Sequence, residues 1–403
     1  MKFRVICFDG LITSNPSEVI YISSHKNVLM LLSLTLFIGF FILVVAIFPY
    51  LVFFTGIHLG KKEVPAQEPE DYPEISIIIA AYNEASVIRE RIFNIKESEY
   101  PIDKYEIILV DDCSSDNTLG DAEDACREAG INNTVMKNQE RMGTNRSINR
   151  AIEAASHSIL VTTDADVFFE KNALKKLITR LMSEDRIAAV CGDLRPLPEE
   201  LTHTSQIENT YRDYYGRMCA WESAVDSTYN FNGGLVAFKK DRVHRIDDRR
   251  GADDANTAFE AIRRGYRAVY EIDAVVYEDI PENFSRQYKQ KIRRATRLIE
   301  ATVANFDLLK KKRPFSRLFY PLRIMMYLLT PLLFFISCIF LLTSLLLINF
   351  LLPIGAIAAF LAISLISKSN IITAFVTNQA YLLRGLLNLG KDMRVWESTS
   401  KKQ

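Results

Sequence analysis

Two aspartates one residue apart, Asp164 and Asp166, follow the apolar run SILVTT at residues 158–163. The run is typical of a buried strand, and carboxylates at the end of such a strand are costly to bury without a partner. A divalent cation bound to a diphosphate would be such a partner, because Mg²⁺ prefers one or two carboxylates together with phosphate oxygens. The D-x-D spacing is common, so this interpretation depends on the rest of the chain.

Polar residues also follow two earlier apolar runs. Asn83 and Glu84 come after the run at 74–82, and Asp111 and Asp112 end the next one. A single aspartate after a strand often caps the following helix, and the SSDNT run after Asp112 suits a cap or turn. Capping alone explains three such strand ends less well, because ligands bind at the carboxyl ends of strands in a parallel sheet.

The elements that position these residues alternate along the chain. Strands are predicted within 74–84, 106–112, 132–137 and 158–166, and helices within 85–98, 119–130 and 146–155. This alternation predicts an α/β domain, Rossmann-like, with a mostly parallel sheet that is covered by helices on both faces.

Charge and cysteine usage exclude several classes of protein. The 403 residues carry 49 Lys+Arg and 49 Asp+Glu, and this neutral balance gives no reason to expect nucleic acid as a partner. The six cysteines are scattered without a CxxC pair, which indicates neither a zinc site nor a disulfide framework.

Three apolar stretches, at 27–58, 324–350 and 351–367, predict membrane-spanning helices. The first has no Asp, Glu, Lys or Arg and exceeds the roughly 20 residues needed to cross a bilayer. It is also too long for a cleaved signal peptide. Residues 301–323 are predicted to form a basic interfacial segment and 370–403 an interfacial helix and tail.

Basic residues flank the predicted spans unevenly. Lys61 and Lys62 follow the first span, a cluster of lysines and arginines at 310–317 precedes the second, and the turn at 349–353 has no charge. The positive-inside rule then places residues 70–300 in the cytoplasm in a multi-pass protein of the cell membrane. It also places residues 1–26 outside, which fits poorly with the basic residues Lys2, Arg4 and Lys26.

The motifs AAYNE, VDDCSSDNT and TTDAD, in that order, resemble those of the inverting family-two glycosyltransferases with the A-type nucleotide-sugar fold. The resemblance continues through NFNGGLVAFKKD, ADDANTAFEAIRRGYRAVY and QKIRRATR, over roughly residues 73–300. With the flanking spans, the chain is similar to membrane-embedded polysaccharide synthases such as those of cellulose, chitin and hyaluronan. The resemblance implies a glycosyltransferase that takes a nucleotide sugar, with a UDP-sugar as the expected donor.

The resemblance also implies roles for the donor-side residues. Ala81, Tyr82 and Glu84 would line the nucleotide base and ribose, and Asp112 would read the uracil or ribose. Asp164 and Asp166 would hold Mg²⁺ or Mn²⁺ together with the diphosphate. Cations that match the family's diphosphate contacts are Arg146, Arg293 and Arg294, with Gln290 beside them.

The triplet Ala252-Asp253-Asp254 stands where the family has an acidic triplet that opens a helix, and the last acid of that triplet is the general base. We therefore predict that Asp254 removes the proton of the acceptor hydroxyl, and that Asp253 lies on the acceptor side and raises the pKa of Asp254. Attack opposite the departing diphosphate inverts the anomeric carbon. The simpler alternative is that both carboxylates only stabilise the start of the helix.

Two positions depart from the family pattern. Thr144 replaces a familiar lysine, whose charge Arg146 would supply, and Arg294 replaces the tryptophan that stacks on the acceptor sugar. Acceptor stacking is therefore expected from Trp221 or from Tyr214 and Tyr215. Three spans would hardly form a long pore in one chain, a difficulty that a homo-oligomer would relieve.

The acceptor is left open between a glycan and a polyprenyl-phosphate lipid. A polyprenyl-phosphate hexose synthase is one alternative function, in which a phosphate oxygen attacks and no strong base is required. A non-catalytic membrane protein that binds a nucleotide is another. The two departures favour that second alternative, whereas the retained acids Asp164, Asp166 and Asp254 argue against it.

Overall fold

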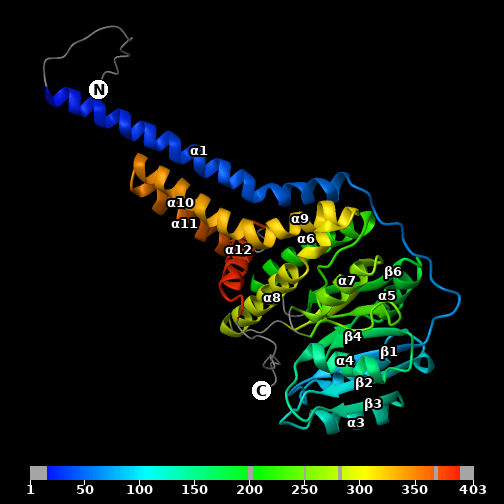
Figure 1. Ribbon diagram of the computed structural model, residues 1–403. Coiled ribbons are helices and arrows are strands. Elements are labelled where there is room, and N and C mark those ends of the chain that lie inside the picture. Colours follow the sequence, from blue (N-terminus) through cyan, green and yellow to red (C-terminus); the bar gives the residue numbers. More distant parts are fainter. Residues whose placement is uncertain (1–15, 198–202, 249–250, 280–283, 367–370, 391–403) are drawn as a thin grey trace. The chain divides into compact units, whose positions relative to one another are not determined.

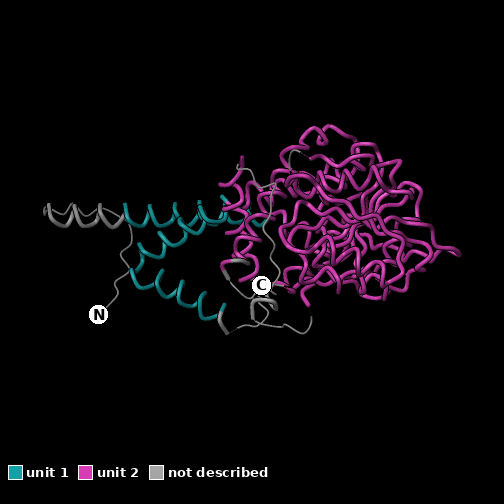
Figure 2. Tube along the Cα trace, turned by 90° about the horizontal axis from the view of Figure 1, so that it is seen from below, with its two compact units in different colours: residues 1–47, 332–366 teal, residues 48–331, 367–403 magenta. Residues whose placement is uncertain are grey.

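A computed structural model describes residues 16–197, 203–248, 251–279, 284–366 and 371–390 (Figure 1). The chain divides into two compact units, which Figure 2 colours separately. One comprises Met1–Ile47 and Leu332–Ile366, and the other comprises Phe48–Pro331 and Ser367–Gln403. Most of the predicted N-terminal segment, the end of the third predicted span and the C-terminal tail lie outside the described residues.

The larger unit is built on one sheet, whose strands run in the order β3-β2-β1-β4-β7-β6-β8-β5 (Figure 1). The four strands predicted from the sequence are parallel neighbours. The sheet is mixed rather than parallel throughout, because β7 runs antiparallel to β4 and β6, and β5 runs antiparallel to β8. The bounds are β1 (Ile75–Ala81), β2 (Tyr105–Asp111), β3 (Asn132–Lys137), β4 (Ile159–Asp164), β5 (Val167–Phe169), β6 (Ile187–Pro196), β7 (Val236–Lys239) and β8 (Arg267–Glu278).

Helices cover both faces of this sheet, as the unbroken apolar strands require. Ile75, Ile77 and Ile79 of β1 belong to the core that includes α2 and α3, whereas Ile78 belongs to the core that includes α4. Successive side chains of a strand point to opposite faces, which explains this division. The helices are α2 (Ile88–Lys96), α3 (Thr118–Ala129), α4 (Thr144–Ala154), α5 (Ala173–Met182), α6 (His203–Val225), α7 (Asp253–Arg263) and α8 (Phe284–Ala304).

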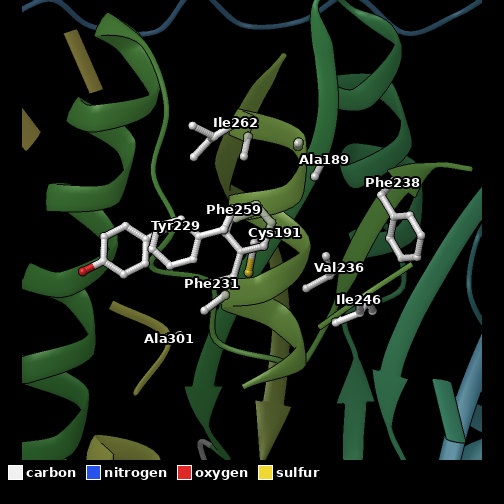
Figure 3. Packing of buried hydrophobic residues seen from close by; sticks show 14 of the residues in the cluster. Ala189, Cys191, Tyr229, Phe231, Val236, Phe238, Ile246, Phe259, Ile262 and Ala301 are labelled. Carbon is white, nitrogen blue, oxygen red and sulfur yellow. The ribbon is translucent and has the colours of Figure 1, made fainter. Parts of the chain in front are cut away.

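Aromatic packing fixes α7 against the rest of this unit (Figure 3). Phe259 of α7 stacks on Tyr229 with 4.3 Å between the ring centroids, and its ring also lies 5.6 Å from that of Tyr320. All three side chains are almost fully buried. Because aromatic pairs contribute beyond the area they bury, this cluster stabilises the position of α7 in this unit.

Short helical segments continue the chain after α8. They are a 3₁₀ turn (Phe306–Lys310), a π-helical turn (Phe315–Phe319), α9 (Tyr320–Ile324) and a second π-helical turn (Met325–Leu329). Arg323 of α9 is 1% exposed and donates to Glu222 of α6 from Nε at 2.7 Å and from Nη2 at 3.0 Å. This buried pair ties α9 to α6, so the predicted interfacial segment 301–323 is partly packed on the domain.

Helix α12 (Ile371–Leu387) also packs on this unit, against α8 and α6. Gly385 makes the close approach, since a Cβ there would lie 3.1 Å from the Cβ of Ala295. Gln379 is fully buried and donates to the hydroxyl of Tyr50 at 2.8 Å. The segment that the sequence predicts as an interfacial helix therefore contributes to the domain that carries the predicted site.

The smaller unit contains the first part of α1 (Pro16–Leu59), most of α10 (Thr330–Ile348) and α11 (Leu351–Ile366). Two helical stretches, Asn27–Leu59 and Phe315–Ile348, are long and apolar enough to cross a membrane, and Leu351–Ser364 is a shorter apolar helix. Within this unit Ser344 donates to Thr35 at 2.7 Å. A Cβ at Gly39 would lie 3.0 Å from Leu341, so α1 and α10 approach closely there.

Candidate active site

A cavity of about 280 Å³ lies where the carboxyl ends of β1, β4 and β8 meet the start of α7 and the middle of α8. Helices α6 and α12 provide another part of its lining. Eight of the predicted site residues line this cavity: Glu84, Asp164, Asp166, Asp253, Asp254, Gln290, Arg293 and Arg294.

The first acidic pair is presented by β4. Asp164 is the last residue of the strand, and Asp166 follows in the turn to β5. Arg91 of α2 supports this turn from behind: its Nη2 donates to Thr163 Oγ1 at 2.9 Å and its Nε to the Asp164 carbonyl at 3.3 Å. Arg91 is fully buried, and its guanidinium lies 3.9 Å from the centroid of the Phe169 ring.

Burial raises the pKa of both carboxyls of this pair. Repulsion by Asp166 and Asp253 adds to the effect at Asp164, and repulsion by Glu278 adds to it at Asp166. The charges around the cavity are also unbalanced, with eight carboxylates against five cations. The carboxylates are Glu84, Asp164, Asp166, Asp193, Glu208, Asp253, Asp254 and Glu278, and the cations are Arg212, Lys291, Arg293, Arg294 and Arg297.

This excess of negative charge fits a bound cation near Asp164 and Asp166. Within the part of the chain that the structure describes, no three aspartate, glutamate, histidine or cysteine side chains converge as a complete ligand set. Two carboxylates suit Mg²⁺ or Mn²⁺ that takes its other ligands from phosphate oxygens. The residues present therefore fit the predicted metal together with the diphosphate of a donor.

The second acidic pair opens α7. The Oδ1 atom of Asp254 accepts the backbone N–H of Ala255 at 2.6 Å, as the helix-start alternative predicts. Its Oδ2 atom faces Gly233, where a Cβ would lie 3.5 Å from Asp254 Oδ2 and 3.7 Å from Asp164 Oδ2. Gly233 has φ 77°, so a glycine both allows this loop conformation and leaves space between the two acidic pairs.

The pKa of Asp254 is raised to about 7, mainly by burial and then by the neighbouring Asp253. Burial also raises the pKa of Asp253, although Arg297 opposes the shift. A carboxyl with a pKa near the working pH is suited to general-base catalysis. The arrangement therefore allows Asp254 to accept a proton from a hydroxyl held in the cavity.

The start of α7 is held by contacts to α8 and α4. A Cβ at Gly251, which has φ 78°, would lie 2.6 Å from the Cβ of Ala301 in α8. Arg297 of α8 donates to the Gly251 carbonyl at 2.7 Å and to Asn145 of α4 at 2.7 Å. These contacts fix Gly251, two residues before Asp253. The position of the second acidic pair therefore depends on α4 and α8 as well as on α7.

Helix α8 carries Gln290, Arg293 and Arg294, the residues predicted to contact the diphosphate. Gln290 and Arg294 bind a carboxylate of the protein, whereas Arg293 does not. Gln290 donates to Glu278 at 3.0 Å, and Arg294 donates to both carboxylate oxygens of Glu278. Arg212 of α6 donates to the same carboxylate at 3.2 Å. Burial alone would raise the pKa of Glu278, but Arg294 and Arg212 lower it. Glu278 thus neutralises the arginine that replaces the family tryptophan.

Arg293 differs from its neighbour. It makes no hydrogen bond or ion pair to any residue that the structure describes. Burial lowers its pKa to about 10, repulsion by Arg294 and Arg297 adds to the shift, and attraction by Asp164 and Asp166 opposes it. A half-buried guanidinium whose charge acts on the first acidic pair is available to an anionic ligand such as a diphosphate.

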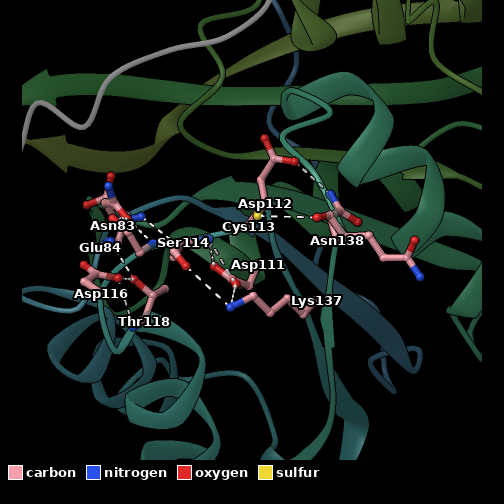
Figure 4. A network of polar contacts seen from close by, with 12 residues as sticks. Asn83, Glu84, Asp111, Asp112, Cys113, Ser114, Asp116, Thr118, Lys137 and Asn138 are labelled. Carbon is pink, nitrogen blue, oxygen red and sulfur yellow. Dashed lines mark hydrogen bonds and ion pairs between the residues drawn. The ribbon is translucent and has the colours of Figure 1, made fainter.

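Four predicted donor-side residues lie outside the cavity lining. They are Ala81, Tyr82, Asp112 and Arg146. Asp112 is buried and accepts the backbone N–H groups of Met142 at 2.8 Å and Gly143 at 2.9 Å. Asn138 donates to it at 2.8 Å (Figure 4). Its carboxylate therefore organises the loop before α4, and its predicted contact with the donor base remains a prediction.

Tyr82 and Arg146, two of the predicted donor-side residues, contact other side chains of the protein. The guanidinium of Arg141 lies 3.3 Å from the centroid of the Tyr82 ring. Arg146, expected to supply a charge to the diphosphate, lies instead 3.8 Å from Asp248, and Thr144 is the residue of α4's first turn that lines the cavity.

The placement of Trp221 differs from its predicted acceptor-side role, because its ring is used for packing. It lies 5.5 Å from Phe53 and 5.1 Å from Phe319 between ring centroids. A Cβ at Gly56 would lie 2.3 Å from this ring. Of the alternatives that the sequence suggested for stacking, Tyr215 lines the cavity, whereas Tyr214 and Trp221 do not.

Sequence reasoning missed Arg91 and Glu278. The sequence could have indicated Arg91, because a charged residue among Ile88, Ile92 and Ile95 on the apolar face of a helix needs a buried partner. Glu278 ends the strand β8 in the same way that Asp164 ends β4, so it repeats the pattern of a carboxylate at a strand end.

Comparison with known proteins gives matches over most of the chain. The family model described as Glycosyl transferase family 2 matches residues 76–234. The model described as Glycosyl transferase family group 2 matches residues 159–366, which is more than half of the 403 residues.

Curated relatives include two bacterial proteins. The chain is 26% identical over 285 residues to the poly-beta-1,6-N-acetyl-D-glucosamine synthase of Staphylococcus aureus, a match that covers 69% of this chain and 66% of the relative. It is 25% identical over 273 residues to the probable glycosyltransferase YdaM of Bacillus subtilis, with 64% of each covered. The chain thus spans about two thirds of the length of these relatives.

Among solved structures, the chain is similar to a mannosyltransferase from Pyrobaculum calidifontis in complex with GDP-Man and Mn²⁺. The two are 25% identical with a TM-score of 0.76, over 89% of this chain and 99% of that one. This likeness confirms the A-type fold that the sequence motifs predict.

Proposed function

The chain belongs to glycosyl transferase family group 2, and on that premise we propose that it is a membrane-bound, metal-dependent, inverting glycosyltransferase. It transfers a sugar from a nucleotide-sugar donor to a glycan or lipid-linked acceptor at the cytoplasmic face of the membrane. The observation that carries this proposal is the arrangement around Gly233, with Asp164 and Asp254 both close to it and the half-buried cation Arg293 lining the same cavity.

The reaction follows from these groups. An acceptor hydroxyl in the cavity gives its proton to Oδ2 of Asp254 as its oxygen attacks the anomeric carbon of the donor sugar. The bond between that carbon and the diphosphate oxygen breaks on the opposite face, so the configuration inverts. Arg293 donates hydrogen bonds to the departing diphosphate, where negative charge develops.

A divalent cation held by Asp164 and Asp166 would neutralise part of the leaving-group charge when bound. Arg91 contributes indirectly, because its hydrogen bonds to Thr163 and to the Asp164 carbonyl orient the turn that presents both carboxylates. The donor's base and ribose are assigned to Ala81, Tyr82, Glu84 and Asp112 at the ends of β1 and β2.

The donor is expected to be a UDP-sugar or a GDP-sugar. Resemblance to polysaccharide synthases supports the first, and the likeness to a mannosyltransferase in complex with GDP-Man and Mn²⁺ supports the second. The two long apolar helical stretches support a membrane location. We propose a multi-pass protein of the cell membrane, with the domain on the cytoplasmic side and self-association into a homo-oligomer.

Nucleoside diphosphate release from a panel of UDP- and GDP-sugars tests this function. The full chain is purified in lipid nanodiscs, and each donor is supplied with Mg²⁺ or Mn²⁺ and with glycan and polyprenyl-phosphate acceptors. One donor should be turned over, and Asp254→Asn should reduce transfer by about 10²- to 10⁴-fold.

Asp124→Asn, an exposed aspartate on α3, is the matched control and should behave as the wild type. If a folded wild-type protein turns over no donor, the transferase function is wrong. Full activity of Asp254→Asn would instead favour the polyprenyl-phosphate hexose synthase, whose attacking phosphate needs no strong base.

A further inference from the structure

The part of the cavity that α6 and α12 provide is aromatic. Tyr211 and Tyr215 of α6 lie with 6.0 Å between their ring centroids, and Tyr381 of α12 lines the same cavity. We call these three residues the tyrosine wall. Leu298 and Leu382 lie beside them in the cavity lining. Tyrosine offers an apolar ring face with a polar tip, a combination suited to the faces and hydroxyls of a sugar.

Two hydroxyls of the tyrosine wall are not used within the described protein. Tyr215 donates to the Asn230 carbonyl at 2.8 Å, which holds its ring in place. The hydroxyls of Tyr211 and Tyr381, by contrast, make no hydrogen bond to any residue that the structure describes. Neither hydroxyl is a buried unsatisfied atom, so both remain accessible from the cavity and are open to a polar ligand.

The cations near this wall are neutralised by carboxylates. Arg212 donates to Glu208 at 2.9 Å, and Lys291 forms an ion pair with the same glutamate. Arg294 forms an ion pair with Glu278. Arg293 makes no such ion pair with a described residue, and its charge acts on Asp164 and Asp166.

An anionic acceptor would therefore meet little uncompensated positive charge at the tyrosine wall. It would also approach Asp253 and Asp254, which repel it. A neutral polyhydroxyl acceptor avoids both costs, because its hydroxyls pair with tyrosine hydroxyls without a change in charge.

We infer that the acceptor enters as an uncharged saccharide, which lies against the tyrosine wall and hydrogen-bonds to the hydroxyls of Tyr211 and Tyr381. The inference rests on the proposed function and narrows its acceptor from a glycan or polyprenyl phosphate to a glycan end. It assigns to α12 a part of the acceptor site, although that helix lies more than 100 residues after the predicted base Asp254.

Direct binding of saccharides, without any donor, tests the inference. The full chain in nanodiscs is titrated with a β-1,6-linked N-acetylglucosamine tetrasaccharide and with a mannotriose, and binding is followed by saturation-transfer difference NMR. At least one saccharide should bind, and the double variant Tyr211→Phe/Tyr381→Phe should bind it roughly tenfold more weakly, since two hydrogen bonds are lost. Both substitutions keep the rings and so preserve the packing.

Tyr288→Phe is the matched control, because Tyr288 lies 5.8 Å from Tyr381 between ring centroids but does not line the cavity. It should bind the saccharide as the wild type does. Unchanged affinity in the double variant, or no binding of either saccharide, would overturn the inference. So would tighter binding of farnesyl phosphate that displaces the saccharide, since this would identify a phosphate acceptor.

Donor turnover, measured separately, keeps the two proposals apart. Saccharide binding that depends on Tyr211 and Tyr381, in a protein that turns over no donor, would contradict the transferase function and leave the saccharide site standing. Donor turnover with transfer to farnesyl phosphate alone would do the reverse.

Discussion

The two acidic pairs of the cavity have the same composition but are held differently. Asp164 and Asp166 lie at the end of a buried strand, with the guanidinium of Arg91 behind the turn and that of Arg293 beside it. Asp253 and Asp254 open a helix, where one oxygen of Asp254 is already bound by a backbone N–H. Burial raises the pKa of the carboxyls in both pairs, and it raises that of Asp254 to about 7. The pairs therefore differ in how the chain holds them, at a strand end or at a helix start.

In the function proposed above, position in the fold rather than residue type would separate the metal ligands Asp164 and Asp166 from the base Asp254. Gly233 lies close to both pairs, since a Cβ at this position would lie 3.5 Å from Asp254 Oδ2 and 3.7 Å from Asp164 Oδ2. Substitutions at Arg293 and Gly233, and a change in pH, should affect the two acidic pairs to different extents.

Removal of the unpartnered cation should have the largest effect. Arg293→Ala leaves the departing diphosphate without its hydrogen-bond donor, and kcat should fall by about 10²- to 10³-fold. Lys289→Ala, on the exposed side of the same helix, is the control and should retain activity. Steady-state kinetics with the preferred donor measure both. Equal activity of the two variants would remove Arg293 from the mechanism.

Filling the space between the pairs should have the next largest effect. Gly233→Ala places a Cβ 3.5 Å from Asp254 Oδ2 and strains a backbone with φ 77°. A displacement of about 1 Å between reacting groups costs on the order of 10²-fold in rate. Gly265→Ala, which also has positive φ but no neighbouring atom within 4 Å, controls for backbone strain alone. Similar losses in both variants would contradict a specific role for the space at Gly233.

The pH dependence should be smaller and should belong to the helix-start pair. Asp254 must be deprotonated to act as a base, and its pKa is raised to about 7. The value of kcat/KM should therefore be level above this pH and fall tenfold per unit below it. The profile of the wild type, measured from pH 5 to 9, checks this. A profile that stays flat down to pH 5 would show that Asp254 is not the base of the rate-limiting step.

Local patterns predicted the first half of the domain well. Four strands, the helices between them and the first acidic pair follow from apolar runs and polar strand ends that are close in sequence. The second acidic pair was predicted from the family resemblance. The remainder depends on contacts between distant segments. The antiparallel strand β7 and the neutralisation of Arg294 by Glu278 could not be read from local periodicity.

The acceptor side shows the same limit more clearly. The sequence pointed to Trp221 because tryptophan is rare in this chain, but long-range packing against Phe53 and Phe319 takes that ring. Tyr381 comes from α12, which polar residues within an apolar stretch indicated as an interfacial helix. Its contacts with α6 and α8 show that this helix also packs on the domain. Arg294, which looked like a loss of function, is held by a buried carboxylate and so has a defined structural role.

The central claim is that Asp164 and Asp166 hold a divalent cation that binds the donor's diphosphate. Isothermal titration of UDP and of GDP into the full chain in nanodiscs, with and without Mn²⁺, tests it most directly. We predict that one nucleotide binds tightly only with Mn²⁺, and that Asp166→Asn abolishes this metal dependence whereas Asp254→Asn retains it. Nucleotide affinity that is the same with and without Mn²⁺, or that Asp166→Asn leaves unchanged, would contradict the claim.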